Sequence, residues 1–152
     1  TLSSSSAASD VYKRQEQAGV GARVRALPGG LGARVGSSTF SEGERQLLSL
    51  ARGLVGSPRL LLADEPTACV DLHADERVHN VLLGLDATVL MICHRLQHVC
   101  RFDEVLLMHA GEIVERGTPE QLLRAPASRL GALCARAGLD ADALLLAAAR
   151  RD

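Results

Sequence analysis

The chain has 152 residues, of which 47% are hydrophobic and 23% are charged, and its formal net charge is -1. This balance is typical of one globular domain, and it gives no electrostatic reason to expect nucleic acid or an anionic membrane as a partner. Aromatic residues make up only 2% of the chain, so a base-stacking surface is also disfavoured.

The basic residues exclude one kind of motif. Of the 17 Lys and Arg residues 16 are arginine, and Lys13 stands between Tyr12 and Arg14. A Gly-rich phosphate-binding loop of the form GxxxxGK[ST] therefore cannot be drawn anywhere in the chain. The four cysteines show no CxxC spacing, which favours reduced thiols in a cytosolic compartment.

Two N-terminal stretches predict little regular structure. Residues 1–15 are Ser-rich and show no core periodicity, so we expect a disordered or non-native leader there. Residues 19–39 are rich in Gly and Arg, a composition that is typical of loops. We therefore expect regular structure to begin near residue 41.

A helix is predicted directly after that point. Residues 41–44 read Ser-Glu-Gly-Glu, the S-x-x-E pattern of a capping box, and apolar residues then recur at helical spacing. Gly56 and Pro58 end this helix. A capped helix start still directs amides and the positive end of its dipole outward. Ser41 and its neighbours are thus either structural only or also an anion site.

Two apolar runs predict buried strands that end in polar residues. Residues 60–63 are Leu-Leu-Leu-Ala, a pattern typical of a strand buried on both faces, and Asp64 and Glu65 follow directly. After a helix with one apolar face comes the second run, residues 88–93, followed by His94. Ligands of parallel α/β sheets bind at the carboxyl ends of strands, so we expect these polar side chains at the mouth of a site.

The C-terminal part of the chain predicts a hairpin and helices. Residues 104–109 and 112–116 are expected strands, joined across Ala110-Gly111. Thr118 and Pro119 are typical of a helix cap and a first helical residue. One or two further amphipathic helices follow, with a break near Gly138. Strands alternating with helices indicate an α/β layer with a largely parallel sheet.

Asp64, Glu65 and His94 each have two interpretations. As carboxylates at the mouth of a sheet, Asp64 can hold Mg²⁺ through its water shell and Glu65 can orient or deprotonate a water molecule. As turn residues they simply end the strand. His94 is either a structural or a functional histidine, and a zinc site shared with His98 would need further ligands.

Four motifs follow one another in a fixed order. Phe-Ser-Glu-Gly-Glu begins at residue 40, Leu-Leu-Leu-Ala-Asp-Glu at residue 60, Ala-Cys-Val-Asp at residue 68, and Ile-Cys-His ends at His94. In this order they resemble the signature motif, Walker B, the D-loop and the switch histidine of an ATP-binding cassette, the nucleotide-binding domain of ABC transporters. The residues around Ser41 and Asp71 are most similar to those of the multidrug-resistance-associated subfamily C. The tail FDEVLLMHAGEIVERGTPEQLL resembles the hairpin and helix that close transporter cassettes.

The resemblance implies an α/β, partial P-loop NTPase (ABC ATPase) fold with a largely parallel sheet flanked by helices, a C-terminal β-hairpin and helices, and the Walker A half missing. It suggests a partial cassette in residues 16–125 and a C-terminal helical extension in residues 126–152. Walker A, the adenine-stacking aromatic and the Q-loop glutamine would lie upstream of residue 16, so we expect the complete protein to be longer.

The same resemblance implies the roles of individual residues. Glu65 and His94 would be catalytic and Asp64 would hold the metal, while the nucleotide would be bound by Ser41, Glu42, Gly43, Glu44 and Asp71. The implied cofactors are ATP and Mg²⁺. The implied partners are a second cassette in a head-to-tail sandwich and the transmembrane domains of an ABC transporter, with no nucleic acid and with this domain on the cytosolic side of the membrane.

The implied function of the complete protein is ATP binding and hydrolysis that drives transmembrane transport. We expect the chain alone to be inactive, because it lacks Walker A. Glu42 replaces a glycine and Glu44 replaces the usual glutamine of the signature motif, and carboxylates there repel a phosphate. One alternative is therefore a degenerate or regulatory cassette without turnover, and another is an ATPase of the SMC or repair type.

Overall fold

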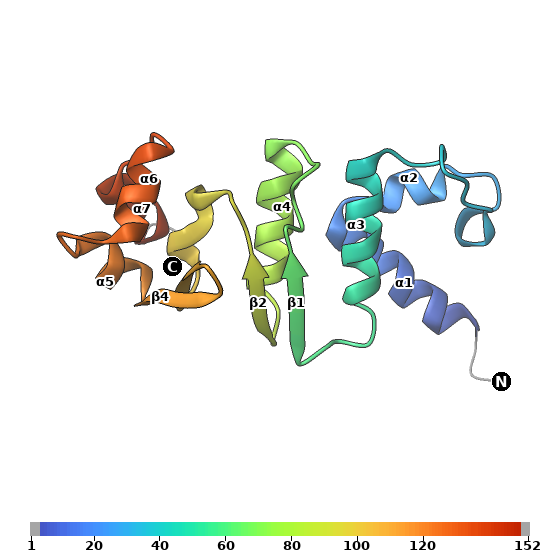
Figure 1. Cartoon of the computed structure of the whole chain (residues 1–152). Helices are drawn as coiled ribbons and strands as arrows, with labels where there is room; N and C mark the ends of the chain where they lie inside the picture. The colour runs from blue at the N-terminus through green and yellow to red at the C-terminus, as the bar shows by residue number, and fades with distance from the viewer. Residues whose placement is uncertain (1–3, 150–152) are drawn as a thin grey trace. The chain divides into compact units, whose positions relative to one another are not determined.

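The chain divides into two units, Thr1–Cys93 and His94–Asp152, in the computed structural model, which describes residues 4–149 (Figure 1). We describe each unit by itself. We expected a boundary after residue 125, whereas the two units meet between Cys93 and His94. Side chains on both sides of residue 125 share one core, so no division falls there. The described residues after 125 thus pack with those before it, and the extent of the cassette stays a prediction.

Helices and two strands make up the first unit. Its elements in chain order are α1 (Ser4–Ala18), α2 (Gly21–Arg25), η1 (Gly30–Gly32), α3 (Glu42–Gly53), β1 (Leu60–Asp64), α4 (Leu72–Leu83) and β2 (Thr88–Ile92). The core of the unit is built largely by its helices, and its buried members include Val24, Leu50, Leu54, Val78 and Leu82. The predicted helix after Ser41 and the two predicted strands are confirmed.

Helix α1 differs from the disorder that we expected for residues 1–15. Gln15 and Ala18 are buried, and Tyr12 packs against the same core as Ala18. Residues 12, 15 and 18 therefore form a stripe at the i, i+3 spacing of one helix face. The Ser-rich composition of the segment concealed this stripe, because only three positions carry it.

Strands β1 and β2 pair in parallel, with a register that runs from Leu60↔Thr88 to Asp64↔Ile92. Side chains alternate between the two faces of a strand, so each face has its own set of residues. Leu61 and Met91 point to the helical core of the unit. Figure 1 shows α4 behind both strands, which places this helix on the covered face.

The opposite face of these strands is bare, which corrects the expectation that both faces are buried. Leu60, Leu62, Leu90 and Ile92 are between 54% and 69% exposed. Among residues 4–149, β1 and β2 pair only with each other, and the helical layer covers one face. Parallel sheets are normally covered on both faces, so this is part of a larger α/β arrangement, as the partial fold predicts.

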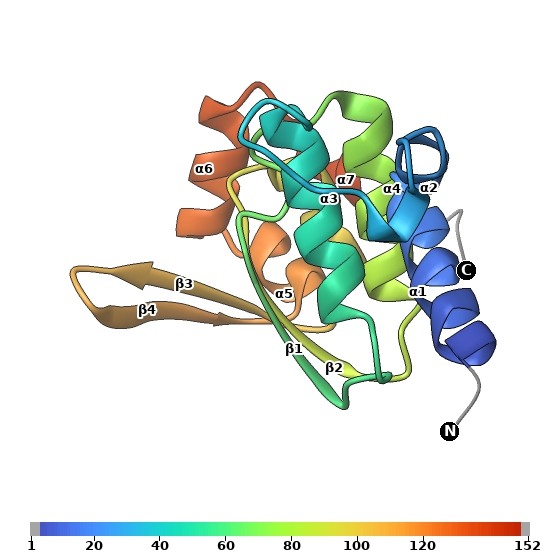
Figure 2. The same ribbon diagram turned by 90° about the vertical axis from the view of Figure 1, so that its right-hand side faces the viewer.

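The second unit contains η2 (Leu96–Arg101), β3 (Val105–His109), β4 (Glu112–Gly117), α5 (Pro119–Arg124), α6 (Arg129–Arg136) and α7 (Ala141–Ala149). Figure 2 shows β3 and β4 as a long two-stranded ribbon. The strands are antiparallel, with a register shift between Leu107 and Met108. Ala110 and Gly111 have φ values of 49° and 83°, the left-handed pair that a tight hairpin turn needs. The predicted hairpin is confirmed.

Helix starts and breaks in the second unit follow the predicted signals. Thr118 caps α5 in a capping box with Gln121, and Pro119 is the first helical residue. Gly138, with a φ of 72°, lies between α6 and α7 at the predicted break. No helix formed by residues 4–149 combines the length and the apolarity that crossing a bilayer requires.

A carboxylate from β4 closes the start of α6. Ser128 is the N-cap residue, and its hydroxyl oxygen accepts the amide N–H of Gly131 at 3.1 Å. The Glu115 carboxylate accepts the amide N–H of Arg129 at 3.0 Å and that of Leu130 at 2.8 Å. The Ser128 hydroxyl donates to the same carboxylate at 3.3 Å. The amides of the first turn of α6 are thus satisfied within the unit.

Candidate functional site

The predicted capping box forms at the start of α3. Ser41 is the N-cap residue, and its hydroxyl oxygen accepts the Glu44 amide N–H at 3.2 Å. The Glu44 carboxylate accepts the Ser41 amide N–H at 2.7 Å. Within the described part of the chain, the amides of Glu42 and Gly43 donate to no protein acceptor. These two amides, at the positive end of the helix dipole, can therefore donate to an anion.

The loop over residues 67–70 packs against this helix start. A Cβ atom on Gly43 would lie 2.6 Å from the Cys69 carbonyl oxygen, so only glycine fits while the loop keeps its place. The Gln46 side-chain oxygen accepts the Cys69 amide N–H at 3.0 Å. The signature-like helix and the D-loop-like segment are thus held together by packing and by one hydrogen bond.

Asp64 and Glu65 lie at the carboxyl end of β1, as predicted. Asp64 is the last residue of the strand, opposite Ile92 in the register. The Glu65 amide N–H donates to the Ile92 carbonyl oxygen at 2.9 Å, which extends the ladder by one bond. Glu65 has a φ of 44°, a left-handed conformation that is unfavourable for a residue with a side chain. Such strain is found most often at functional sites, where the surrounding structure maintains it.

A pocket of about 390 Å³ lies between α3 and the end of β1. Glu42 and Arg45 line it from the first turns of α3, and Asp64 and Glu65 line it from the strand end. The structure therefore brings three of the predicted carboxylates, those of Glu42, Asp64 and Glu65, to one cavity. Their negative charge suits a metal cation, whereas the amides of α3 suit an anion.

The Cys69 thiol shows that two of these carboxylates converge on the D-loop-like segment. Its pKa is raised above the ordinary value, first by local desolvation, then by the charge of Glu42 and a hydrogen bond with its side chain, and then by the charge of Glu65. Each of these causes favours the neutral thiol. Cys69 is thus a neighbour of both carboxylates, and Glu42 is the one with which its thiol is hydrogen-bonded.

Asp71 has a structural role that the sequence left open. It is the N-cap residue of α4, and its carboxylate accepts the Ala74 amide N–H at 2.9 Å. That hydrogen bond is the main reason why the pKa of Asp71 is lowered, and His73 contributes further. Asp71 is fixed to its own helix start, at the end of the loop that touches Gly43.

His94 is the first residue of the second unit and follows Ile92, the last residue of β2, by two positions. The placement at a strand end agrees with its sequence pattern. Its role toward a nucleotide stays a prediction. His98, the histidine considered with it for zinc, is buried in η2.

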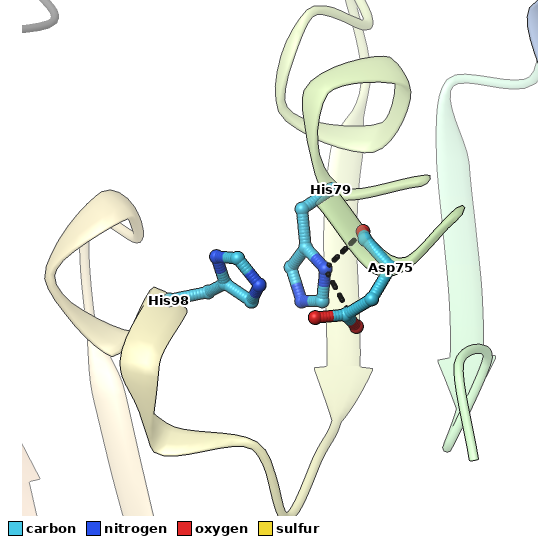
Figure 3. Close-up of side chains that lie close together, drawn as sticks. All are labelled: Asp75, His79 and His98. Atoms are coloured by element: carbon cyan, nitrogen blue, oxygen red, sulfur yellow. Dashed lines mark hydrogen bonds and ion pairs between the residues drawn. The ribbon is translucent and has the colours of Figure 1, made fainter. Parts of the chain in front are cut away.

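The sequence did not point to several residues that support the site. Gln46 and Arg23 are two of them, because their contacts join segments that are distant along the chain. Sequence reasoning also missed a buried pair inside α4 that does not line the pocket, in which His79 Nδ1 lies 2.9 Å from the Asp75 carbonyl oxygen and 3.4 Å from its carboxylate (Figure 3). The i, i+4 spacing of an acid and a histidine was the only signal for that pair.

The carboxylates of the pocket fit Mg²⁺, and the separate amides at the start of α3 fit a phosphate group. Mg²⁺ prefers oxygen ligands, which the adjacent carboxylates of Asp64 and Glu65 offer. Phosphate groups bind at helix N-termini, which α3 offers through two amides. An α/β unit with paired carboxylates at a strand end and an open helix start near them has the features of the class of nucleotide-binding proteins.

Comparison with known proteins narrows this class. A family profile described as "ABC transporter" matches residues 9–68, so the match begins inside the expected leader. The chain is 42% identical over 88 residues to "ABC transporter 7" of Pyricularia oryzae, an alignment that covers 57% of this chain and 5% of the relative. It is 40% identical over 121 residues to "Mycobactin import ATP-binding/permease protein IrtA" of Mycobacterium tuberculosis, with 78% and 14% covered.

A solved structure agrees with these relatives. The chain matches a bacterial Atm1-family ABC exporter with ATP bound, at a TM-score of 0.75 and 27% identity, over 87% of this chain and 24% of the exporter chain. The chain belongs to the ABC transporter family and forms part of its nucleotide-binding domain. The chain spans only 5% of the length of the first relative and 14% of the length of the second. The SMC-type and regulatory alternatives are not favoured by these matches.

Proposed function

We propose that this chain supplies the signature motif, Walker B, the D-loop and the switch histidine of a cassette that, in the complete protein, binds and hydrolyses ATP to drive transport across a membrane. One observation carries the proposal. Asp64 and Glu65 leave the end of β1 in the same pocket that the first turns of α3 line. The family relationship supports the reaction, and the pocket supports the assignment of the residues.

Asp64 and Glu65 divide the chemistry of hydrolysis between them. Asp64 is the residue that would hold Mg²⁺, which when bound neutralises charge on the phosphate oxygens. Glu65 follows it in the chain and would orient the attacking water and accept its proton. The left-handed backbone of Glu65 supports this role, because it turns the side chain away from the course of the strand.

The start of α3 would act on a nucleotide held by a second cassette. In a head-to-tail sandwich, Ser41 and the amides of Glu42 and Gly43 would contact the terminal phosphate bound to the partner cassette. Glu44 would contribute by closing the capping box. Asp71 would couple the two sites, since it ends the loop that packs against Gly43.

His94 would contact the terminal phosphate of the nucleotide in the chain's own cassette. An imidazole there can donate a hydrogen bond to a phosphate oxygen and report whether that phosphate is present. The complete protein would couple this state to transmembrane domains, with the cassette on the cytosolic side. Neither the net charge nor the scarcity of aromatic residues favours a nucleic-acid partner.

The deciding experiment is Glu65→Gln in the complete transporter. We expect ATP hydrolysis to fall by about 10²–10⁴-fold, the usual contribution of a general base, while ATP binding is retained. Glu120→Gln is the matched control, because Glu120 is an exposed glutamate that pairs with Arg124 in α5. Hydrolysis close to wild type in Glu65→Gln would contradict the assignment, and loss in both variants would indicate a general folding defect.

A further inference from the structure

Arg23 of α2 contacts both sides of the α3 start. We propose that Arg23 neutralises Glu44 and so positions the signature segment to accept a phosphate group, which makes it a positioning residue outside every motif of the chain. The proposal rests on the proposed function, because it concerns the same helix start. It also addresses the acidic residues that set this signature segment apart from the family pattern.

Three contacts fix the Arg23 side chain. Its Nε lies 3.3 Å from Glu44 Oε1, and one terminal nitrogen donates to the Thr39 carbonyl oxygen at 2.8 Å. The guanidinium carbon lies 5.6 Å from the centre of the Phe40 ring, within the range of a cation–π contact. One side chain therefore joins the segment before Ser41 to the first turn of α3.

The two oxygens of Glu44 have separate tasks. Oε2 accepts the Ser41 amide N–H at 2.7 Å, and Oε1 faces Arg23. A glutamine would close the same capping box without a charge. The glutamate thus adds one negative charge beside the helix start that would accept the phosphate, and Arg23 supplies the opposite charge at the distance of an ion pair.

Other charges at this helix start are used differently. Arg45 donates to the Phe40 carbonyl oxygen at 2.8 Å and to the Ser37 carbonyl oxygen at 3.2 Å, so it holds the backbone of the preceding segment. The Glu42 side chain is hydrogen-bonded with Cys69. The Arg23 and Glu44 side chains are 45% and 31% exposed, so salt should weaken their attraction.

The test compares four variants of the complete transporter by their KM for ATP and their kcat. Arg23→Met keeps the length of the side chain but exposes the Glu44 charge, so we expect KM to rise about tenfold with kcat within about twofold. Glu44→Gln can keep the capping box but leaves the Arg23 charge without its partner, so its KM should fall below wild type. Arg23→Met/Glu44→Gln removes both charges, so it should lose the KM increase of Arg23→Met. Arg25→Met is the matched control, because Arg25 lies on the same helix and pairs with Glu16.

Salt and a conservative variant separate charge from packing. The KM increase in Arg23→Met should shrink between 50 mM and 500 mM NaCl, and Arg23→Lys should recover most of the wild-type KM. The proposal is overturned if Arg23→Met has a wild-type KM. It is also overturned if the double variant is as impaired as Arg23→Met, since Arg23 would then act only through Thr39 and Phe40.

Glu65→Gln in the same preparations separates this proposal from the proposed function. If wild-type hydrolysis is present and Glu65→Gln abolishes it, a silent Arg23→Met contradicts only the role of Arg23. If the complete protein does not hydrolyse ATP, or Glu65→Gln leaves hydrolysis intact, the proposed function fails and the role of Arg23 fails with it.

Discussion

The starts of helices α3 and α6 have the same parts in different arrangements. Each has a serine N-cap, Ser41 or Ser128, and a glutamate carboxylate beside its first turn. At α6, Glu115 comes from β4 and accepts the amides of the first two helical residues. At α3, Glu44 comes from the helix itself and reaches back to the N-cap amide. The corresponding two amides of α3 have no protein acceptor among residues 4–149.

This difference shows where an external anion can bind. A helix N-terminus attracts one negative charge through its first amides and its dipole. Glu115 provides that charge permanently at α6, so the α6 start only stabilises the fold. The α3 start keeps the same two amides for a ligand. A capping box suits this purpose, because it fixes the helix end without covering its first residues.

Gly43→Ala should produce the largest difference in activity between a change at the α3 start and the same change at the α6 start. A Cβ at this position would lie 2.6 Å from the Cys69 carbonyl oxygen, so the loop over residues 67–70 must move. We expect ATP hydrolysis by the complete transporter to fall by about 100-fold, as misplaced catalytic segments do. Steady-state hydrolysis assays measure this loss.

Gly131→Ala at the α6 start is the control for that variant. The nearest atom to its Cβ would be Ser128 Cβ at 3.6 Å, an ordinary contact. We expect unchanged hydrolysis and a gain in stability of about 0.5–1 kcal/mol from helix propensity. Equal losses of activity in both glycine variants would contradict the distinction between the two helix starts.

Glu115→Ala should destabilise the second unit by about 1–3 kcal/mol, because it removes the acceptor of two backbone amides, of which that of Leu130 is half-buried. Urea denaturation of the complete protein measures the change in the free energy of unfolding. Glu112→Ala, on the same strand but exposed, is the control. An unchanged denaturation midpoint in Glu115→Ala would mean that this carboxylate does not secure α6.

Ser41→Ala and Ser128→Ala form a matched pair. Each removes an N-cap hydroxyl, so each should cost about 1 kcal/mol of stability. Only Ser41→Ala should raise the KM for ATP, because only its helix start is open to a phosphate. A similar rise in KM for Ser128→Ala would show that the effect follows from stability and not from position.

The smallest expected effect is the loss of stability on Asp71→Asn at the start of α4, and the size of this loss depends on pH. Its pKa is lowered from 3.8, chiefly by the Ala74 amide, so its charge stabilises the fold above that pH. The contribution is lost as the pH falls through the lower pKa of the folded state. The denaturation midpoint of Asp71→Asn should therefore lie below wild type at pH 7, and the two should converge in acid. A constant difference down to pH 2 would contradict this.

Local signals predicted most of the elements, because each acts over a few residues. The capping box at Ser41, the hairpin turn at Ala110 and the break at Gly138 all depend on neighbours within one turn. The paired carboxylates were found because a run of four apolar residues with an abrupt polar end is visible in the sequence alone. Their approach to Glu42 in one pocket was not predicted, because the order of the elements does not say how close a helix start lies to a strand end.

The parts that were missed depend on distant residues. Arg23 and Glu44 are far apart in sequence, and no local pattern pairs them. The weak stripe of α1 becomes meaningful only when α3 is present to bury it. The apolar run predicted a strand buried on both faces, but a run of residues does not show which other segment covers each face. Leu62 is exposed because nothing among residues 4–149 covers its face of the strand.

The bare face of β1 and β2 affects how the chain folds and assembles in a cell. Four apolar side chains are more than half exposed on β1 and β2, and no further strand among residues 4–149 pairs with these two. Such a face favours association with other apolar surfaces. Until that face is covered, correct assembly competes with aggregation, and aggregation becomes faster as the concentration of the chain rises. The yield of soluble material is therefore governed by how soon a covering layer arrives, and chaperones that shield apolar strands should bind this segment first.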